Sequence, residues 1–186
     1  LIKKIRNLKQ DKNKNLILMK IGSISEDKNI EKRVSITPDI AKKYIDLGID
    51  VQITENYGEH LGYSNSNYEK QGATIIKSKK ELIEKSDIIV QMGLIEDDDL
   101  SLLNSKHTYI GVLNSHKNKE RLSSLIEKKV NFFSLDLLPR ITRAQSMDIL
   151  SSQANLAGYK AVVESFSIFE KAIPMMMTCL LYTSDA

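Results

Sequence analysis

The chain has 186 residues, of which 41% are hydrophobic and 27% charged, a composition typical of folded soluble proteins that excludes a disordered chain. Its net charge of +3 is uneven, because residues 1–20 hold seven basic side chains and one acidic one, while the remainder is slightly acidic. The single cysteine, Cys179, excludes an internal disulfide, and three scattered histidines lack the spacing of metal ligands, so we expect no metal site.

The basic N-terminal arm allows two interpretations. Such an arm can bind nucleic acid or a membrane surface, or it can be a solvated extension. No aromatic residues are interleaved with its lysines and arginine, which favours the extension, and we expect no nucleic-acid partner. No apolar run reaches the roughly 18–20 residues that span a bilayer, and the N-terminus lacks the apolar region of a signal peptide, so we expect a cytoplasmic protein.

Short apolar segments alternate along the chain with segments of helical spacing. The first helix has the clearest bounds, with Thr37 as N-cap, Pro38 at its first position and Gly48 as its stop. The pattern predicts strands at 16–21, 51–54, 87–92, 109–113 and 130–135, and a short helix and a third strand within 68–76. It predicts further helices within 78–86, 96–104 and 118–129.

This alternation is typical of βαβ units, in which a parallel sheet is covered on both faces. We therefore expect an α/β fold with a doubly wound, mostly parallel, Rossmann-like (flavodoxin-like) sheet, followed by a long C-terminal helix. No strand is followed by G-x-G-x-x-G, so the chain carries no dinucleotide fingerprint of its own.

The stretch "PRITRAQSMDILSSQANLAGYKA" at residues 139–161 is unusually rich in polar side chains of fixed geometry. One interpretation is structural: Thr142 and Gln145 form a capping box at the start of a helix. The helix then presents an apolar stripe on one face and small polar groups on another. The stripe comprises Met147, Leu150, Ala154, Ala157 and Ala161, and the polar face comprises Gln145, Asp148, Ser151, Ser152 and Asn155.

A second interpretation makes the same stretch a ligand site. Arg140 and Arg143 precede the first helical turn, where free backbone amides and the helix dipole already favour anions. The stretch also follows the strand at 130–135, at the carboxyl end of a parallel sheet, where α/β proteins bind their ligands. The residues alone leave both interpretations open.

The stretch closely resembles the signature of the soluble, NAD-binding alpha subunit of proton-translocating NAD(P) transhydrogenase. The opening "MKIGSISEDKNIEKRVSITPDIAKKYIDLG" (residues 19–48), with its E-x-R-V-x-x-T-P pattern at 31–38, is similar to the same family, as are "GYSNSNYEKQGATII" and "SDIIVQM". The similarity runs from Met19 to about Thr178. Its opening is shared with alanine dehydrogenase and related amino-acid dehydrogenases.

The resemblance implies hydride transfer between NAD(H), bound by this subunit, and NADP(H), held on a partner domain. It implies a homodimer, membrane subunits that couple transfer to proton movement, and a cytoplasmic location at the inner (plasma) membrane through those subunits. It also implies that the loop of Arg140, Ile141, Thr142, Arg143, Gln145, Asp148 and Ser151 meets the nicotinamide end of the cofactor. Within it Gln145 lies nearest NADP(H), and Arg140, Gln145 and Asp148 are the catalytic group.

Several departures from the family accompany this resemblance. Alanine dehydrogenases carry a lysine and a histidine where this chain has Gln91 and Asn114, which argues against amino-acid oxidation; transhydrogenases commonly keep that lysine too, which leaves its ion pair in question here. We expect residues 1–18 to be a basic extension foreign to the family, 19–143 the N-terminal α/β domain, 144–178 a long helix towards a Gly-rich NAD-binding domain that is missing, and 179–186 a foreign tail. The alternatives are an alanine dehydrogenase-like enzyme and a non-catalytic assembly module. A fragment of this kind would be inactive alone.

Overall fold

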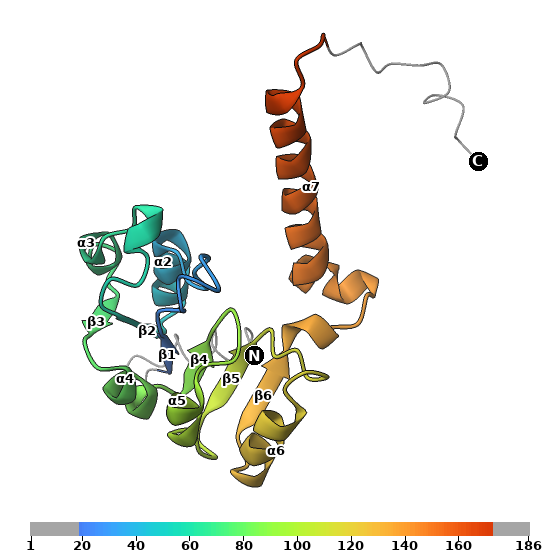
Figure 1. The fold of residues 1–186 in the computed structure, drawn as a ribbon. Coiled ribbons are helices and arrows are strands. Elements are labelled where there is room, and N and C mark those ends of the chain that lie inside the picture. The colour runs from blue at the N-terminus through green and yellow to red at the C-terminus, as the bar shows by residue number, and fades with distance from the viewer. Residues whose placement is uncertain (1–18, 173–186) are drawn as a thin grey trace. The chain divides into compact units, whose positions relative to one another are not determined.

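The computed structural model describes residues 19–172. They belong to two units, one ending at Leu138 and the other beginning at Pro139, and each is described by itself. In the first unit six strands form one sheet (Figure 1). They are β1 (Lys20–Ser23), β2 (Asp50–Thr54), β3 (Thr74–Ile76), β4 (Ile88–Val90), β5 (Thr108–Gly111) and β6 (Asn131–Ser134).

Helices fill the connections between these strands. They are α2 (Pro38–Asp46), η1 (Glu59–Leu61), α3 (Asn65–Glu69), α4 (Lys79–Lys85), α5 (Asp97–Ser101) and α6 (Lys119–Glu127), and the turn η2 (Leu135–Leu137) follows β6. The second unit contains η3 (Thr142–Met147) and the long helix α7 (Ile149–Ile168). None of the helices in residues 19–172 is long and apolar enough to cross a membrane.

All five strand pairs are parallel, and the strand order is β3-β2-β1-β4-β5-β6. The expected doubly wound, Rossmann-like α/β fold with a C-terminal helix is therefore confirmed. In this order the chain runs outward from β1 to β3, returns, and runs outward again from β4 to β6. The order reverses between β1 and β4, and the carboxyl ends of these two strands form the switch point at which such sheets bind ligands.

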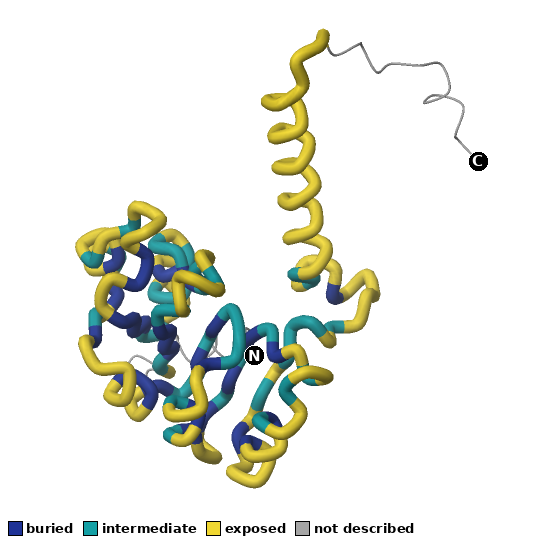
Figure 2. The backbone as a smooth tube through the Cα atoms, viewed as in Figure 1, coloured by how far each residue is buried: buried dark blue, intermediate teal, exposed yellow. Residues whose placement is uncertain are grey.

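Two apolar cores lie on the two faces of the sheet, and the strands that separate them are largely buried (Figure 2). One core joins Ile21, Val51 and Ile53 of the strands to Ala41 of α2 and Tyr68 of α3. The other joins side chains of α4, α5 and α6 to Ile89 and Tyr109, among others. Burial on both faces explains why these strands appear as nearly continuous apolar runs.

The helix bounds follow the capping residues. Thr37 accepts a hydrogen bond from the Ile40 amide (3.4 Å), Pro38 occupies the first helical position, and Gly48 ends the turn after α2 with φ +83°. Ser78 caps α4 in the same way, accepting from Glu81 N at 3.4 Å. Thr37, Pro38 and Gly48 thus have the roles predicted from the sequence.

The long helix begins later than predicted. Residues Thr142–Met147 form 3₁₀ turns, Asp148 has an extended backbone (φ −73°, ψ 95°), and the α-helix starts at Ile149 instead of Ala144. It ends at Ile168, whereas the prediction continued it to residue 178; residues 173–178 lie outside the described part, as do residues 16–18 of the first predicted strand. The bend at Asp148 separates the two helical segments.

Candidate functional site

A pocket of about 660 Å³ lies at the switch point of the sheet. Its lining comes from the segments that follow β1 (Ile24 to Asp27), β4 (Gln91 to Glu96) and β5 (Val112 and Asn114), together with the charged side chains of Glu31, Arg33, Lys79 and Asp99. Because parallel strands end at one edge of the sheet, these segments meet although they are far apart in sequence.

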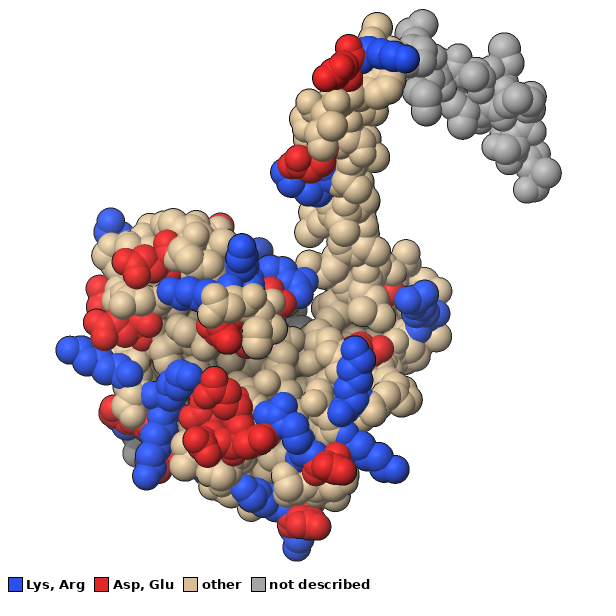
Figure 3. All heavy atoms as spheres, in the orientation of Figure 1, with Lys and Arg blue, Asp and Glu red and all other residues tan. Residues whose placement is uncertain are grey.

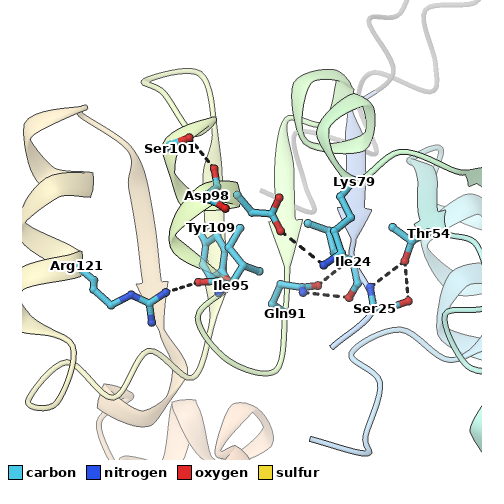
Figure 4. Close-up of polar contacts among 11 residues, drawn as sticks. Ile24, Ser25, Thr54, Lys79, Gln91, Ile95, Asp98, Ser101, Tyr109 and Arg121 are labelled. Atoms are coloured by element: carbon cyan, nitrogen blue, oxygen red, sulfur yellow. Dashed lines mark hydrogen bonds and ion pairs between the residues drawn. The ribbon is translucent and has the colours of Figure 1, made fainter. Parts of the chain in front are cut away.

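Gln91 joins the two strands at this point (Figure 4). Its side chain is 3% exposed; Oε1 accepts from the Ile24 amide at 2.9 Å, and Nε2 donates to the Ile24 carbonyl at 3.0 Å. Next to Ile24, the Ser25 amide donates to Thr54 Oγ1 at 2.8 Å, which ties the same segment to β2. The floor of the pocket is therefore fixed by uncharged hydrogen-bonding groups.

A chain of buried hydroxyl groups continues from Gln91 into the sheet. The Tyr57 hydroxyl accepts from the amides of Ser35 (2.9 Å) and Ile36 (3.2 Å) and lies 2.7 Å from Ser23 Oγ, to which it donates. Ser23 Oγ in turn lies 2.8 Å from Gln91 Oε1. Burial raises the pKa of Tyr57, so its hydroxyl stays protonated and serves as a fixed donor.

Glu26 is the most deeply placed acid of the pocket. Its Oε1 accepts from the Met92 amide at 2.7 Å, which connects the β1 and β4 segments a second time. Burial raises the pKa of Glu26 in spite of that hydrogen bond. At the rim, Arg33 donates to Glu31, with Nε–Oε1 at 2.8 Å, and this pair lowers the pKa of Glu31.

The other rim carries the acidic first turn of α5. Acidic side chains gather here on the face that Figure 3 shows, with basic side chains beside them. Lys79 Nζ lies 3.8 Å from Asp99 Oδ2, and Arg121 Nε lies 2.6 Å from Asp97 Oδ1. Burial raises the pKa of Asp99. Acids outnumber bases around the pocket, so its electrostatics disfavour a small anionic substrate.

Gln91 and Asn114, which the sequence singled out as departures from the dehydrogenase pattern, both line this pocket. Asn114 is exposed and adopts a left-handed backbone (φ +45°), which asparagine tolerates better than most residues. His116 is exposed and does not line the pocket. At these two positions the pocket therefore presents amides rather than groups that titrate near neutral pH.

The loop predicted to bind the cofactor lies in the second unit. Asp148 Oδ2 accepts from Ser151 Oγ at 2.6 Å, and Oδ1 accepts from the amides of Leu150 (3.0 Å) and Ser151 (3.1 Å). These hydrogen bonds lower the pKa of Asp148, and the positive charge of Arg140 lowers it further. Three predicted site residues, Arg140, Asp148 and Ser151, are therefore brought together.

The predicted capping box of Thr142 and Gln145 is wrong, because Asp148 is the N-cap of α7 and the Thr142 side chain caps nothing. Aspartate is as good an N-cap as threonine, and its two oxygens take two amides and a hydroxyl at once. The side chains of Ile141, Thr142, Arg143 and Gln145 are exposed, and those of Thr142, Arg143 and Gln145 make no hydrogen bond within residues 19–172.

The helix α7 carries more apolar surface than the predicted stripe. Its side chains are exposed throughout the second unit, including Leu156 (61%), Tyr159 (74%) and Phe166 (52%) (Figure 2). At 100° per residue these three lie on the side of the helix opposite Leu150 and Ala154. A helix that is apolar on two sides is normally enclosed by other elements.

The sequence did not predict the pocket at the switch point. Glu26 and Gln91 were not predicted as site residues, and Arg33 appeared only within the E-x-R-V pattern. One signal was available: Gln91 interrupts an otherwise apolar strand, and a buried polar side chain in such a position requires partners. No group of three or more histidine, cysteine, aspartate or glutamate side chains in residues 19–172 is arranged to hold a metal ion.

The strand order, the switch-point pocket and the long helix after β6 define a domain of the doubly wound, dinucleotide-enzyme class. Residues 22–157 match the family described as alanine dehydrogenase/PNT, N-terminal domain, and the chain belongs to this family.

Curated relatives include the first of the alpha-subunit polypeptides of the NAD(P) transhydrogenase of Rhodospirillum rubrum, 34% identical over 165 residues that cover 86% of this chain and 43% of the relative. The NAD(P) transhydrogenase subunit alpha of Cereibacter sphaeroides is 37% identical over 81% of this chain and 29% of its own length. Alanine dehydrogenase 1 of Staphylococcus aureus is more distant, at 24% identity over 78% of this chain and 38% of the relative. The chain thus spans less than half the length of these relatives.

Solved structures agree with this assignment. The transhydrogenase from Sinorhizobium meliloti superposes with a TM-score of 0.74 at 35% identity, covering 86% of this chain and 48% of that one. An L-alanine dehydrogenase superposes with a TM-score of 0.60 at 21% identity over 63% of this chain and 32% of that one, which supports the fold alone.

Proposed function

We propose that this chain is the N-terminal part of the NAD(H)-binding alpha subunit of a proton-translocating NAD(P) transhydrogenase. The observation that carries the proposal is the joint arrangement of Arg140, Asp148 and Ser151 in the loop before α7. The transhydrogenase relatives named above, at 34–37% identity, support it over the more distant alanine dehydrogenase.

The polar groups of this loop suit the nicotinamide end of a dinucleotide. Nicotinamide supplies a hydride donor or acceptor carbon when bound, so the protein itself needs no acid, base or metal for the transfer. What the protein must do is hold the ring and its ribose in a near-attack geometry and exclude water. Asp148 is ionised and hydrogen-bonded to Ser151, so the pair offers acceptors to ribose hydroxyls or to a carboxamide NH₂.

Arg140 and Gln145 complete the proposed site. The exposed Arg140 guanidinium is free to donate to a carboxamide oxygen, and its charge also keeps Asp148 ionised. Gln145 has an exposed amide without a hydrogen-bond partner in the described chain, so it is available to contact NADP(H) on the partner domain. Ile141, Thr142 and Arg143 connect these groups and would line the cofactor.

The proposal extends to assembly and location. A homodimer, an NADP(H)-binding domain and membrane subunits would complete the enzyme and place this chain on the cytoplasmic side of the inner membrane. The apolar surface of α7 on two sides supports an assembled rather than isolated helix.

The test is a chimera in which residues 19–172 replace the matching segment of the Rhodospirillum rubrum subunit, mixed with its NADP(H)-binding partner. Hydride transfer from NADPH to an NAD⁺ analogue well above that of the partner alone is expected, without NAD⁺-dependent oxidation of alanine. A chimera that folds and oxidises alanine, but transfers no hydride between nucleotides, would show the proposal to be wrong.

A further inference from the structure

A second pocket of about 440 Å³ lies on the first unit and involves none of the residues of the switch-point pocket. It is lined by Lys20, Gln52, Thr74, Ile75, Ile76, Lys77, Glu81 and Lys85. Lys20 and Thr74 are the first residues of β1 and β3, so the pocket lies towards the amino ends of the strands, whereas the switch-point pocket lies at their carboxyl ends.

The face of the sheet to which this pocket belongs follows from the pleat. A Cβ on Gly22 would meet the Ser86 and Leu82 side chains at the end of α4, so Gly22 faces that helix. Gln52 pairs with Gly22 across the parallel ladder, and Lys20 lies two residues before Gly22, so all three lie on the same face. The pocket therefore lies between α4 and the strands β1 to β3.

Gln52 is the unusual residue of this pocket. It is 5% exposed in the middle of β2, where its neighbours Val51 and Ile53 are fully buried and apolar. Its Nε2 donates to Asp50 Oδ2 at 3.0 Å, and because a carboxylate only accepts, this contact fixes the orientation of the amide. Oε1 is buried and has no hydrogen-bond partner. A buried acceptor of this kind normally has a donor.

The rest of the pocket is basic. Three lysines line it against one acid, and Glu81 is paired with Lys85 at 2.6 Å. The ammonium groups of Lys20 and Lys77 make no ion pair or hydrogen bond within residues 19–172. The Thr74 hydroxyl adds a group that donates and accepts. The pocket thus combines two available positive charges with one buried carbonyl oxygen that lacks a donor.

We propose that this pocket binds a small phosphate monoester that also carries a hydroxyl donor, with Lys20 and Lys77 on the phosphate and the hydroxyl directed to Gln52 Oε1. Lysine ammonium groups bind phosphate as point charges, and the carbonyl oxygen of Gln52 requires an O–H or N–H. A turn of the Gln52 side chain brings the buried oxygen to the pocket. This proposal is independent of the function proposed for the loop before α7.

The experiment titrates the 186-residue chain with ribose 5-phosphate and, separately, with inorganic phosphate, at low ionic strength, by calorimetry and by amide chemical shifts. Ribose 5-phosphate should bind more tightly than inorganic phosphate and should shift the amides of β2 and α4. The double variant Lys20→Gln/Lys77→Gln should weaken binding about tenfold. The variant Gln52→Met, of similar volume, should remove the preference for ribose 5-phosphate over phosphate.

The matched control is Lys70→Gln/Lys80→Gln, which removes the same charge from exposed lysines outside the pocket. It should leave binding unchanged. Equal weakening in the two double variants would show that net charge, and not this pocket, attracts the phosphate, and would overturn the proposal. So would the absence of binding to the unaltered chain, or shifts confined to other elements. If Gln52→Met does not fold, the two double variants still decide.

Discussion

The side chain of Gln91 holds the backbone of Ile24 at both of its polar groups, accepting from the amide at 2.9 Å and donating to the carbonyl at 3.0 Å. This pair closes the sheet at the switch point, where β1 and β4 diverge towards their loops. An uncharged amide does here what the resemblance assigns to a lysine, and no ion pair of residue 91 is needed.

Replacement of Gln91 by leucine should therefore destabilise the fold. The variant Gln91→Leu leaves the Ile24 amide and carbonyl buried without partners, which should cost about 2–4 kcal/mol in the free energy of unfolding. Urea unfolding followed by circular dichroism measures this. The control Gln71→Leu, at a half-exposed position after α3, should change little. Equal stability of the unaltered chain and Gln91→Leu would contradict the role given to this side chain.

His107 predicts a loss of stability at mildly acidic pH. Its buried ring accepts from the Asn104 amide through Nδ1 (3.0 Å) and lies 3.0 Å from the Ile83 carbonyl through Nε2, an arrangement that only the neutral ring allows. Burial lowers its pKa in the folded chain. The unfolded chain therefore takes up the proton first. The contribution of His107 is complete above a pH of about 6.5 and is lost as the pH falls towards the lowered pKa.

Unfolding free energies measured from pH 7.5 to 5 test this, with a slope of at most about 1.4 kcal/mol per pH unit from this one group. The variant His107→Gln should have a shallower slope than the unaltered chain. The variant His116→Gln, at an exposed position, should keep the original slope. Identical slopes in all three proteins would rule out His107 as the group that titrates.

Glu26 should behave in the opposite sense. Its pKa is raised by burial, so the protonated form is favoured in the folded chain. That contribution is present below the unfolded-state pKa of the carboxyl and is lost as the pH rises through the folded value. At pH 7 the ionised carboxylate is a burden, and Glu26→Gln, which can still accept from Met92, should be slightly more stable than the unaltered chain.

Thermal unfolding at pH 7 and pH 4 checks this expectation, with Glu69→Gln on exposed α3 surface as the control. The gain from Glu26→Gln should shrink at pH 4. A loss of stability at pH 7, or a gain that grows on acidification, would show that the charge of Glu26 is favourable in the pocket.

Asp148 should control the start of α7. Its carboxylate holds two amides of the first turn and the Ser151 hydroxyl. The variant Asp148→Ala should therefore reduce helicity and speed amide exchange at Leu150 and Ser151. Because its folded pKa is lowered, the same loss should occur in the unaltered chain when acid protonates this group. The variant Ser146→Ala should have neither effect, and protection unchanged by Asp148→Ala would contradict the capping role.

The sequence predicted those parts of the fold that depend on neighbouring residues. Thr37, Pro38 and Gly48 mark a helix through contacts within a few positions, so their roles were visible without the structure. The choice of cap before α7 was different, because Thr142 and Asp148 both satisfy local preferences and only the actual backbone selects Asp148.

The switch-point pocket was beyond local reasoning. Gln91 and Ile24 are 67 positions apart, and their meeting depends on the strand order and register, which periodicity does not reveal. The loop of Arg140 to Ser151 was noticed because its side-chain types were unusual for an exposed helix in this chain. The resemblance, rather than the spacing, gave it a function.

The most direct test of the central claim compares hydride transfer in the chimera of residues 19–172 with and without Gln145→Asn. The exposed Gln145 is proposed to contact NADP(H), so shortening it by one methylene should slow transfer about tenfold or more by disturbing the near-attack geometry, while NAD(H) binding is unchanged. The variant Ser146→Ala should transfer at the original rate. Equal rates in Gln145→Asn and the unaltered chimera would contradict the claim that this loop positions the two nucleotides.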